Sequence, residues 1–137
     1  MDRRLQAVYE RMYKRELAYR EQLVNRFPAF LAIGIPDSRG RRIRPGIVRG
    51  WLREQRVFAF HHRRRYHFPA FQFADGEPNP IIARVLALVR PLDGWHAMFW
   101  FVGANGWLEG GSPVEMLDIN PEEVLEAAAH ANDVISD

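Results

Sequence analysis

The chain has 137 residues, of which 47% are hydrophobic and 26% are charged, and it contains no cysteine. These values exclude a largely disordered chain, a disulfide framework and thiolate chemistry, and they fit one domain or two small modules that share a core. The net charge of +2 combines three unequal segments: residues 1–38 carry +2, residues 39–65 carry +9 and residues 66–137 carry −9.

This segregation of charge predicts two surfaces with different partners. The middle segment holds ten arginines and one acidic residue, which suits a polyanion, whereas the acidic segment suits a basic protein. The alternative is that both faces are merely solvated, or that they attract one another.

Residues 3–26 are predicted to form a helix. Apolar side chains recur there mostly at steps of three and four, and Glu16 and Arg20 are spaced as a supporting ion pair. Because the apolar stripe is rich in tyrosine, it is not a leucine seam. We expect it to pack on its own domain, with dimerisation as the open alternative.

Residues 27–35 are predicted to form a short helix that begins at Pro28 and stops at Gly34. A loop dense in Pro, Gly, Asp and Ser follows, and Pro45 is expected to begin the next helix. A helix, a loop and a second helix that bears arginines are the parts of a helix-turn-helix unit.

A basic hairpin is predicted after this helix. Residues 57–60 form its first strand, the HHRRR stretch turns the chain, and residues 66–68 form the second strand. Together with the preceding helices, it resembles a winged helix-turn-helix. The connecting loop has nine residues instead of three or four, so it is either an insertion or the sign of a degenerate unit that no longer reads DNA.

Six arginines of this basic segment are the predicted contacts with the phosphates of DNA. The alternative for them is a solvated basic face. They are Arg49, Arg53, Arg56, Arg63, Arg64 and Arg65.

The acidic segment uses one helix-start signal three times. A polar capping residue stands directly before a proline at Asn79-Pro80, Ser112-Pro113 and Asn120-Pro121. Ser112 and Asn120 also have a glutamate three residues later, as in a capping box. These signals predict helices over 80–90 and 112–117, and a last helix that starts at Asn120.

Between these helices lie three further predicted elements. Residues 68–73 are expected to be a strand or an extended segment, and residues 95–102 an aromatic helix that Gly103 ends in a left-handed conformation. Residues 105–111 form a turn-rich loop. Most of the aromatic side chains here are expected in the core, with a base-stacking platform as the alternative.

The motifs of residues 68–129, in order, are FPxFQF, GxPxP, VLxL, GW, NxxLxGxxP and PExVxxA. This series resembles the toxin-binding domain of the Xre/MbcA/ParS-type antitoxins. The chain departs from the pattern at Gly103-Ala104-Asn105, where Thr-Pro-Asn or a similar triplet is expected.

The resemblance implies an antitoxin that binds a RES-type toxin, which has an ADP-ribosyltransferase-like fold and consumes NAD⁺, and blocks its active site with the C-terminal region. It also implies a repressor of its own operon, commonly a homodimer or part of a larger toxin–antitoxin assembly. The alternative is a DNA-binding transcription regulator without a toxin. The expected toxin-binding residues are Asn105, Trp107, Leu108, Gly110, Asn132, Asp133, Ile135, Ser136 and Asp137.

The remaining patterns give no sign of catalysis. The five histidines lack ligand spacing, the glycine pairs lack the GK[ST] of a phosphate loop, and the serines have no evident base. We therefore expect no enzyme, metal or cofactor, and, without a signal peptide or long apolar run, a cytoplasmic protein.

The expected fold is mainly α. A helix-turn-helix-like module with a small β-hairpin spans residues 1–67, and a compact helical toxin-binding domain spans residues 68–137.

Overall fold

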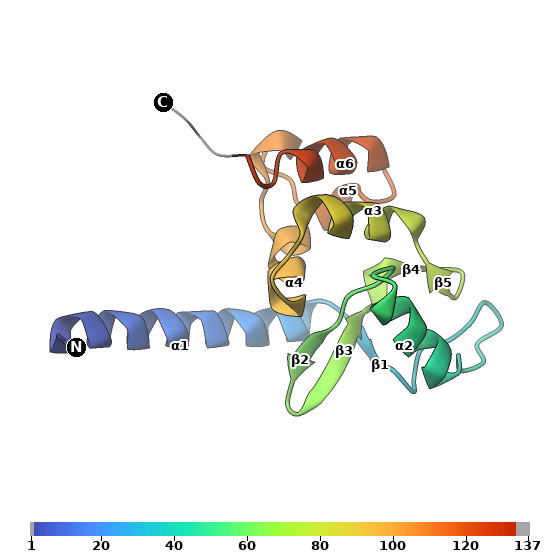
Figure 1. The fold of residues 1–137 in the computed structure, drawn as a ribbon, viewed down its shortest axis with the longest axis horizontal. Helices are drawn as coiled ribbons and strands as arrows, with labels where there is room; N and C mark the ends of the chain where they lie inside the picture. The colour runs from blue at the N-terminus through green and yellow to red at the C-terminus, as the bar shows by residue number, and fades with distance from the viewer. Residues whose placement is uncertain (1, 134–137) are drawn as a thin grey trace.

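A computed structural model describes residues 2–133 of the chain. Its α-helices are α1 (Arg3–Arg26), α2 (Pro45–Arg53), α3 (Pro80–Val89), α4 (Gly94–Val102), α5 (Pro113–Met116) and α6 (Pro121–Ala129). Short 3₁₀ turns lie at η1 (Ala70–Gln72) and η2 (Gly106–Leu108). The prediction of a mainly helical fold is confirmed (Figure 1).

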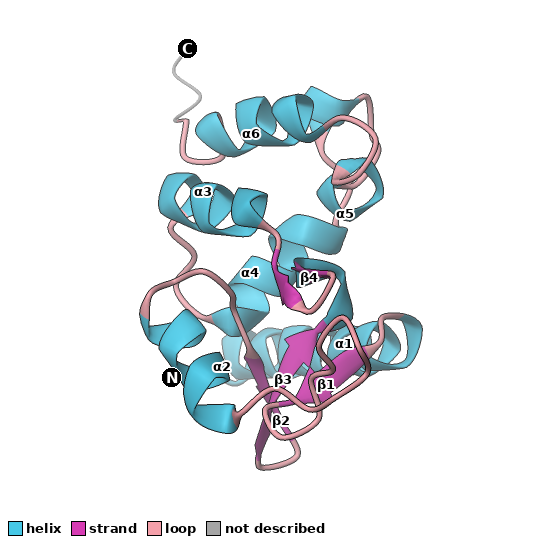
Figure 2. Cartoon of the chain, turned by 90° about the vertical axis from the view of Figure 1, so that its right-hand side faces the viewer, coloured by secondary structure: helices cyan, strands magenta, loops and turns pink. Residues whose placement is uncertain are grey.

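Two small antiparallel sheets complete the fold. Strands β1 (Ala29–Leu31), β2 (Phe60–His62) and β3 (Arg65–Pro69) form the larger sheet, in the order β1-β3-β2. Strands β4 (Phe73–Ala74) and β5 (Glu77–Pro78) form the smaller one. Helix α6 lies on α3, and this pair is stacked over α4 and the larger sheet (Figure 2).

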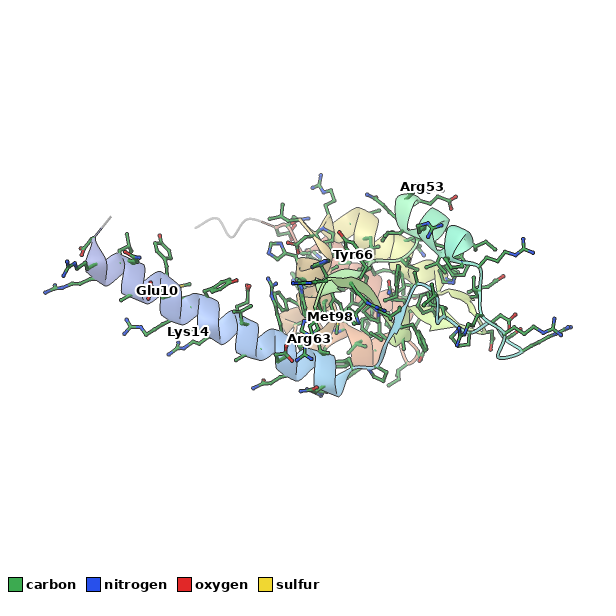
Figure 3. All side chains as sticks on the ribbon, turned by 90° about the horizontal axis from the view of Figure 1, so that it is seen from below. Glu10, Lys14, Arg53, Arg63, Tyr66 and Met98 are labelled. Carbon is green, nitrogen blue, oxygen red and sulfur yellow. The ribbon has the colours of Figure 1, made fainter. Side chains whose placement is uncertain are left out.

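Helix α1 forms as predicted, and Arg20 pairs with Glu16 at 2.7 Å. Its C-terminal half packs on the body, where Leu23 is buried and Tyr19 stacks on Phe99 with ring centroids 5.5 Å apart. Its N-terminal half extends beyond the body, and residues 2–15 are all exposed (Figures 1 and 3). None of the helices within residues 2–133 has the length and apolar character needed to cross a bilayer.

The predicted helix over 27–35 is wrong, because this segment contains strand β1. Phe27 ends α1 in an extended conformation, which the following proline favours. The next three residues then find backbone partners in β3, with Ala29 opposite Pro69 and Leu31 opposite His67. Residues 27–35 and α2 therefore do not form the helix pair that the helix-turn-helix prediction required.

A hairpin is confirmed, but its turn is Arg63-Arg64 and not the whole HHRRR stretch, because both histidines belong to β2 and Arg65 belongs to β3. The first strand begins at Phe60 and not at residue 57. Gln72 explains the later start of the strand, because its buried side chain forms hydrogen bonds with the backbone N–H and carbonyl of Phe58, which are then not available to a neighbouring strand. The Phe58 N–H donates to Gln72 Oε1 at 2.7 Å, and Gln72 Nε2 donates to the Phe58 carbonyl at 2.8 Å. A strand predicted over 68–73 is likewise interrupted, since η1 follows β3 directly.

The three helices that start with proline are confirmed as α3, α5 and α6. Asn79 accepts from the Ile81 N–H at 3.2 Å, and Asn120 accepts from the Glu123 N–H at 3.4 Å. The side chain of Ser112, however, makes no capping bond and is buried, so the capping box predicted there is wrong.

The predicted left-handed stop at Gly103 is also wrong, because its φ is −80°. A Cβ at this position would lie 2.9 Å from the Phe99 carbonyl oxygen, so glycine is required here by the close approach of the Phe99 backbone. The left-handed helix end occurs instead at Arg90, after α3, with φ of 50°.

Two hydrophobic clusters join the predicted modules into one packed body. The larger cluster combines Leu23, Phe58 and Phe60 of the first segment with Val85 and Phe101 of the second. The smaller one places Phe68 beside residues of α2 and the segment before β2. The two segments therefore share their core.

The start of α4 touches the backbone that leads into β2. A Cβ at Gly94 would lie 1.7 Å from the Ala59 carbonyl oxygen, so only glycine fits this contact. The next residue, Trp95, donates its indole N–H to the His61 carbonyl at 2.9 Å, and the ring centroids of Trp95 and Phe60 lie 4.3 Å apart. This contact fixes α4 against the hairpin.

We expect Gly94→Ala to destabilise the protein by about 3 kcal/mol or more, because backbone would have to move to admit the methyl group. Gly46→Ala is the matched control: it also lies in the first turn of a helix, and nothing is within 4 Å of its added Cβ. That control should stabilise by about 0.5–1 kcal/mol. Urea denaturation measures both, and equal midpoints for the two variants would contradict the close contact.

Candidate functional site

Asn105 organises the loop between α4 and α5. Its side chain accepts from the Trp107 N–H at 2.9 Å, and its backbone N–H donates to the Gly111 carbonyl at 3.0 Å. Its own carbonyl accepts from Leu108 and Gly110. Gly110 has φ of 85°, which glycine adopts without strain. Asn105 and Gly110, both predicted as toxin-binding, thus determine the shape of the loop.

Two neighbouring residues of this loop point in opposite directions. Leu108 is buried in the core, whereas Trp107 is 57% exposed. The Trp107 ring stacks on His130 at the end of α6, with centroids 3.8 Å apart and an angle of 10° between the planes. Trp107 is therefore an exposed aromatic surface held in a fixed orientation.

His130 connects this loop to the predicted C-terminal contacts. Its Nδ1 lies 2.6 Å from Oδ2 of Asp133, and its ring stacks on the Trp107 ring. Asn132 turns the other way and donates to the carbonyls of Leu88 and Val89 at 3.1 and 3.0 Å. These are carbonyls that the end of α3 leaves without helical partners.

The structure thus joins the two predicted groups of toxin-binding residues at one surface, which we call the Trp107 surface: Asn105, Trp107, Gly110, His130, Asn132 and Asp133. A shallow pocket of about 390 Å³ adjoins it and is lined in part by Leu88 and Arg90. Leu108 belongs to the core beneath it. Ile135, Ser136 and Asp137 lie outside the described residues.

Sequence reasoning missed His130, which it treated as one of five histidines that lack ligand spacing. No local spacing could have found this residue, since Trp107 and His130 meet only because α6 packs beside η2. Leu88 and Arg90 were also not predicted as site residues. They lie beside the Trp107 surface because α3 packs on α6.

The predicted DNA-contacting arginines are all exposed, but they occupy two places. Three lie on α2 or directly after it, and three form the tip of the hairpin; Arg53 and Arg63 are well separated in Figure 3. Within residues 2–133, no carboxylate forms an ion pair with Arg49, Arg53, Arg64 or Arg65.

The hairpin tip is a two-residue turn in an unfavourable conformation. Arg63 and Arg64 connect His62 to Arg65 with φ of 48° and 67°, which is the pattern of a type I′ turn. Asn-Gly is preferred in this turn, and the left-handed region costs other residues about 1 kcal/mol or more each. The chain nevertheless places two arginines there.

The base of the hairpin is held firmly. Trp95 packs on Phe60, and Glu21 of α1 approaches both His62, at 3.3 Å, and Arg63, at 3.7 Å. On the exposed face of the ribbon, His61 meets Tyr66 edge to face, with ring centroids 5.2 Å apart. The arginine tip and this face of the ribbon are exposed to solvent.

A pocket of about 580 Å³ lies where α2, α3 and α4 meet. Leu52, Val57 and Leu86 supply apolar walls, and Arg90 and Asp93 contribute charged groups. Its size is that of a small-molecule pocket. Within residues 2–133, no three His, Asp or Glu side chains come together as metal ligands would.

No family model, curated protein or solved structure matches this chain. The motif series of residues 68–129 and the geometry of the Trp107 surface are therefore the grounds for a functional proposal.

We expect Trp107→Ala to leave the fold intact and to lower its stability by only about 0.5–1.5 kcal/mol, the contribution of one aromatic stack. Leu108→Ala, one residue away, should cost about 2–5 kcal/mol because it opens a cavity in the core. Chemical denaturation followed by tryptophan-independent circular dichroism measures both values. A larger loss for Trp107→Ala than for Leu108→Ala would contradict the placement of the two side chains.

Proposed function

We propose that the chain is the antitoxin of a type II toxin–antitoxin system and that it binds and neutralises a RES-type, NAD⁺-consuming toxin. The observation that carries this proposal is the exposed Trp107, held on a rigid loop inside the antitoxin-like motif series. Partly exposed tryptophans in fixed orientations are typical centres of protein interfaces, because they bury a large area at little cost in conformational entropy.

The charge around the Trp107 surface supports a basic partner. Residues 66–137 carry −9, and the exposed face of α6 includes Glu122, Glu123 and Glu126. Such a surface would accelerate association with a basic protein and would exclude acidic partners.

The C-terminal residues 132–137 supply the active-site block in this proposal. They contain two aspartates, Asp133 and Asp137. A pocket that binds the pyrophosphate of NAD⁺ presents arginines to anionic oxygens, and carboxylates offer the same acceptors. Deleting residues 132–137 should restore NAD⁺ consumption by the toxin, and full neutralisation by the shortened chain would exclude this block.

The proposal is tested by co-expressing the chain with the RES-type protein encoded beside it. We expect the two to co-purify and NAD⁺ consumption to fall when the chain is added. Trp107→Ala should weaken the complex about 30-fold, since interface tryptophans contribute about 2 kcal/mol or more. Ile119→Ala, which removes another exposed apolar side chain from the acidic half, is the control and should bind as wild type.

If the neighbouring RES-type protein consumes NAD⁺ equally fast with and without the chain, the antitoxin assignment is contradicted. An operon that encodes no RES-type protein would contradict it as well.

We further propose that the basic segment binds duplex DNA of its own promoter, so that the antitoxin represses its operon as a cytoplasmic homodimer or larger assembly. The exposed arginines of the basic segment favour this function, and four of them have no carboxylate partner within residues 2–133: Arg49, Arg53, Arg64 and Arg65. The alternative regulator without a toxin would share this function. If about five arginines meet phosphates, the slope of log K against log salt should be near −4.5. A gel shift without a band at low salt would exclude DNA binding.

A further inference from the structure

The β2–β3 hairpin keeps two arginines where the backbone favours Asn-Gly. We infer that this tip is a DNA-binding finger, and that Arg63 and Arg64 contact phosphates of duplex DNA without help from a recognition helix. The inference rests on the proposed DNA binding and assigns it to one element.

The fold itself gives no reason for these side chains. Within residues 2–133, Arg64 has no carboxylate partner, and the single partner of Arg63 is Glu21 at 3.7 Å. The Arg63 side chain is 79% exposed, so this pair adds little to stability. Both guanidinium groups are therefore available to bind an anion from outside the chain.

The rest of the structure favours the hairpin over α2 as the DNA-binding element. Residues 27–35 contain β1, so α2 lacks the first helix of a helix-turn-helix, which crosses the DNA backbone in such units. A two-stranded ribbon, by contrast, fits the major groove by itself. The hairpin is such a ribbon, and Trp95 and Phe60 fix its base to the body.

Side chains beside the tip extend the same surface. Arg65 adds a third exposed cation, and the exposed His61–Tyr66 pair supplies donors for phosphate oxygens. Glu21 of α1 opposes this charge, because it already occupies one side of Arg63 and His62. A phosphate at the tip would compete with Glu21 for Arg63. Removing the Glu21 carboxylate should therefore strengthen DNA binding, whereas removing the arginines should weaken it.

The test is fluorescence anisotropy of the full chain with a labelled duplex from its operon promoter, at several salt concentrations. We expect the double variant Arg63→Asn/Arg64→Gly to bind about tenfold more weakly and its log K against log salt slope to become shallower by about two. Its thermal midpoint should rise by about 3–6 °C, because Asn-Gly relieves the turn. The variant thus gains stability while it loses affinity.

Three further variants separate charge, turn geometry and position. Arg63→Lys/Arg64→Lys keeps both charges and should keep the wild-type salt slope. Arg3→Gln/Arg11→Gln removes two charges from the free half of α1 and should bind as wild type. Glu21→Gln should bind severalfold more tightly, because it removes the competing carboxylate.

Several outcomes would overturn the inference. These are equal affinity of the Asn-Gly variant and wild type, a lowered thermal midpoint for that variant, and tighter binding of wild type to a matched RNA duplex. If Arg49→Gln/Arg53→Gln abolishes binding and the Asn-Gly variant does not, DNA binding stands but the hairpin is not its element. If wild type binds no duplex at low salt, the proposed DNA binding itself fails.

Discussion

The structure depends on the contact between the start of α4 and the backbone that precedes β2. Gly94 lets two backbones meet where any Cβ would collide with Ala59, and Trp95 then bonds to the hairpin through its indole N–H. Gln72 bonds to the backbone of Phe58, one residue earlier than Ala59, from the other half of the chain. Basic and acidic halves are therefore held together by backbone-level contacts, which tolerate less change than ordinary side-chain packing.

This arrangement places two different surfaces on one rigid body. The Trp107 surface lies over η2 and the end of α6, and the arginine tip lies at the end of the hairpin. Both are attached to the larger hydrophobic cluster, the hairpin through Phe60 and Trp95 and α6 through Val124. A protein partner and a polyanion could bind the same molecule without competing for residues.

Sequence signals located the elements that are specified locally. A polar residue followed by proline located α3, α5 and α6, although Ser112 makes no capping bond, and the apolar period located α1. Both signals act within one helical turn. The failures involve distant partners: β1 needs β3, and the late start of β2 needs the Gln72 side chain. The candidate site divides in the same way. Trp107 could be named from the motif, but its contact with His130 depends on how α6 packs, which no spacing records.

The free half of α1 has a consequence for the local stability of the chain. Helical stretches of this length are marginal in water without tertiary contacts, and residues 2–15 are exposed on every side. Their amide protons should exchange with solvent through fraying of the outer turns, long before the core opens. We therefore expect the first half of α1 to unfold at lower temperature than the body, although one continuous helix links them.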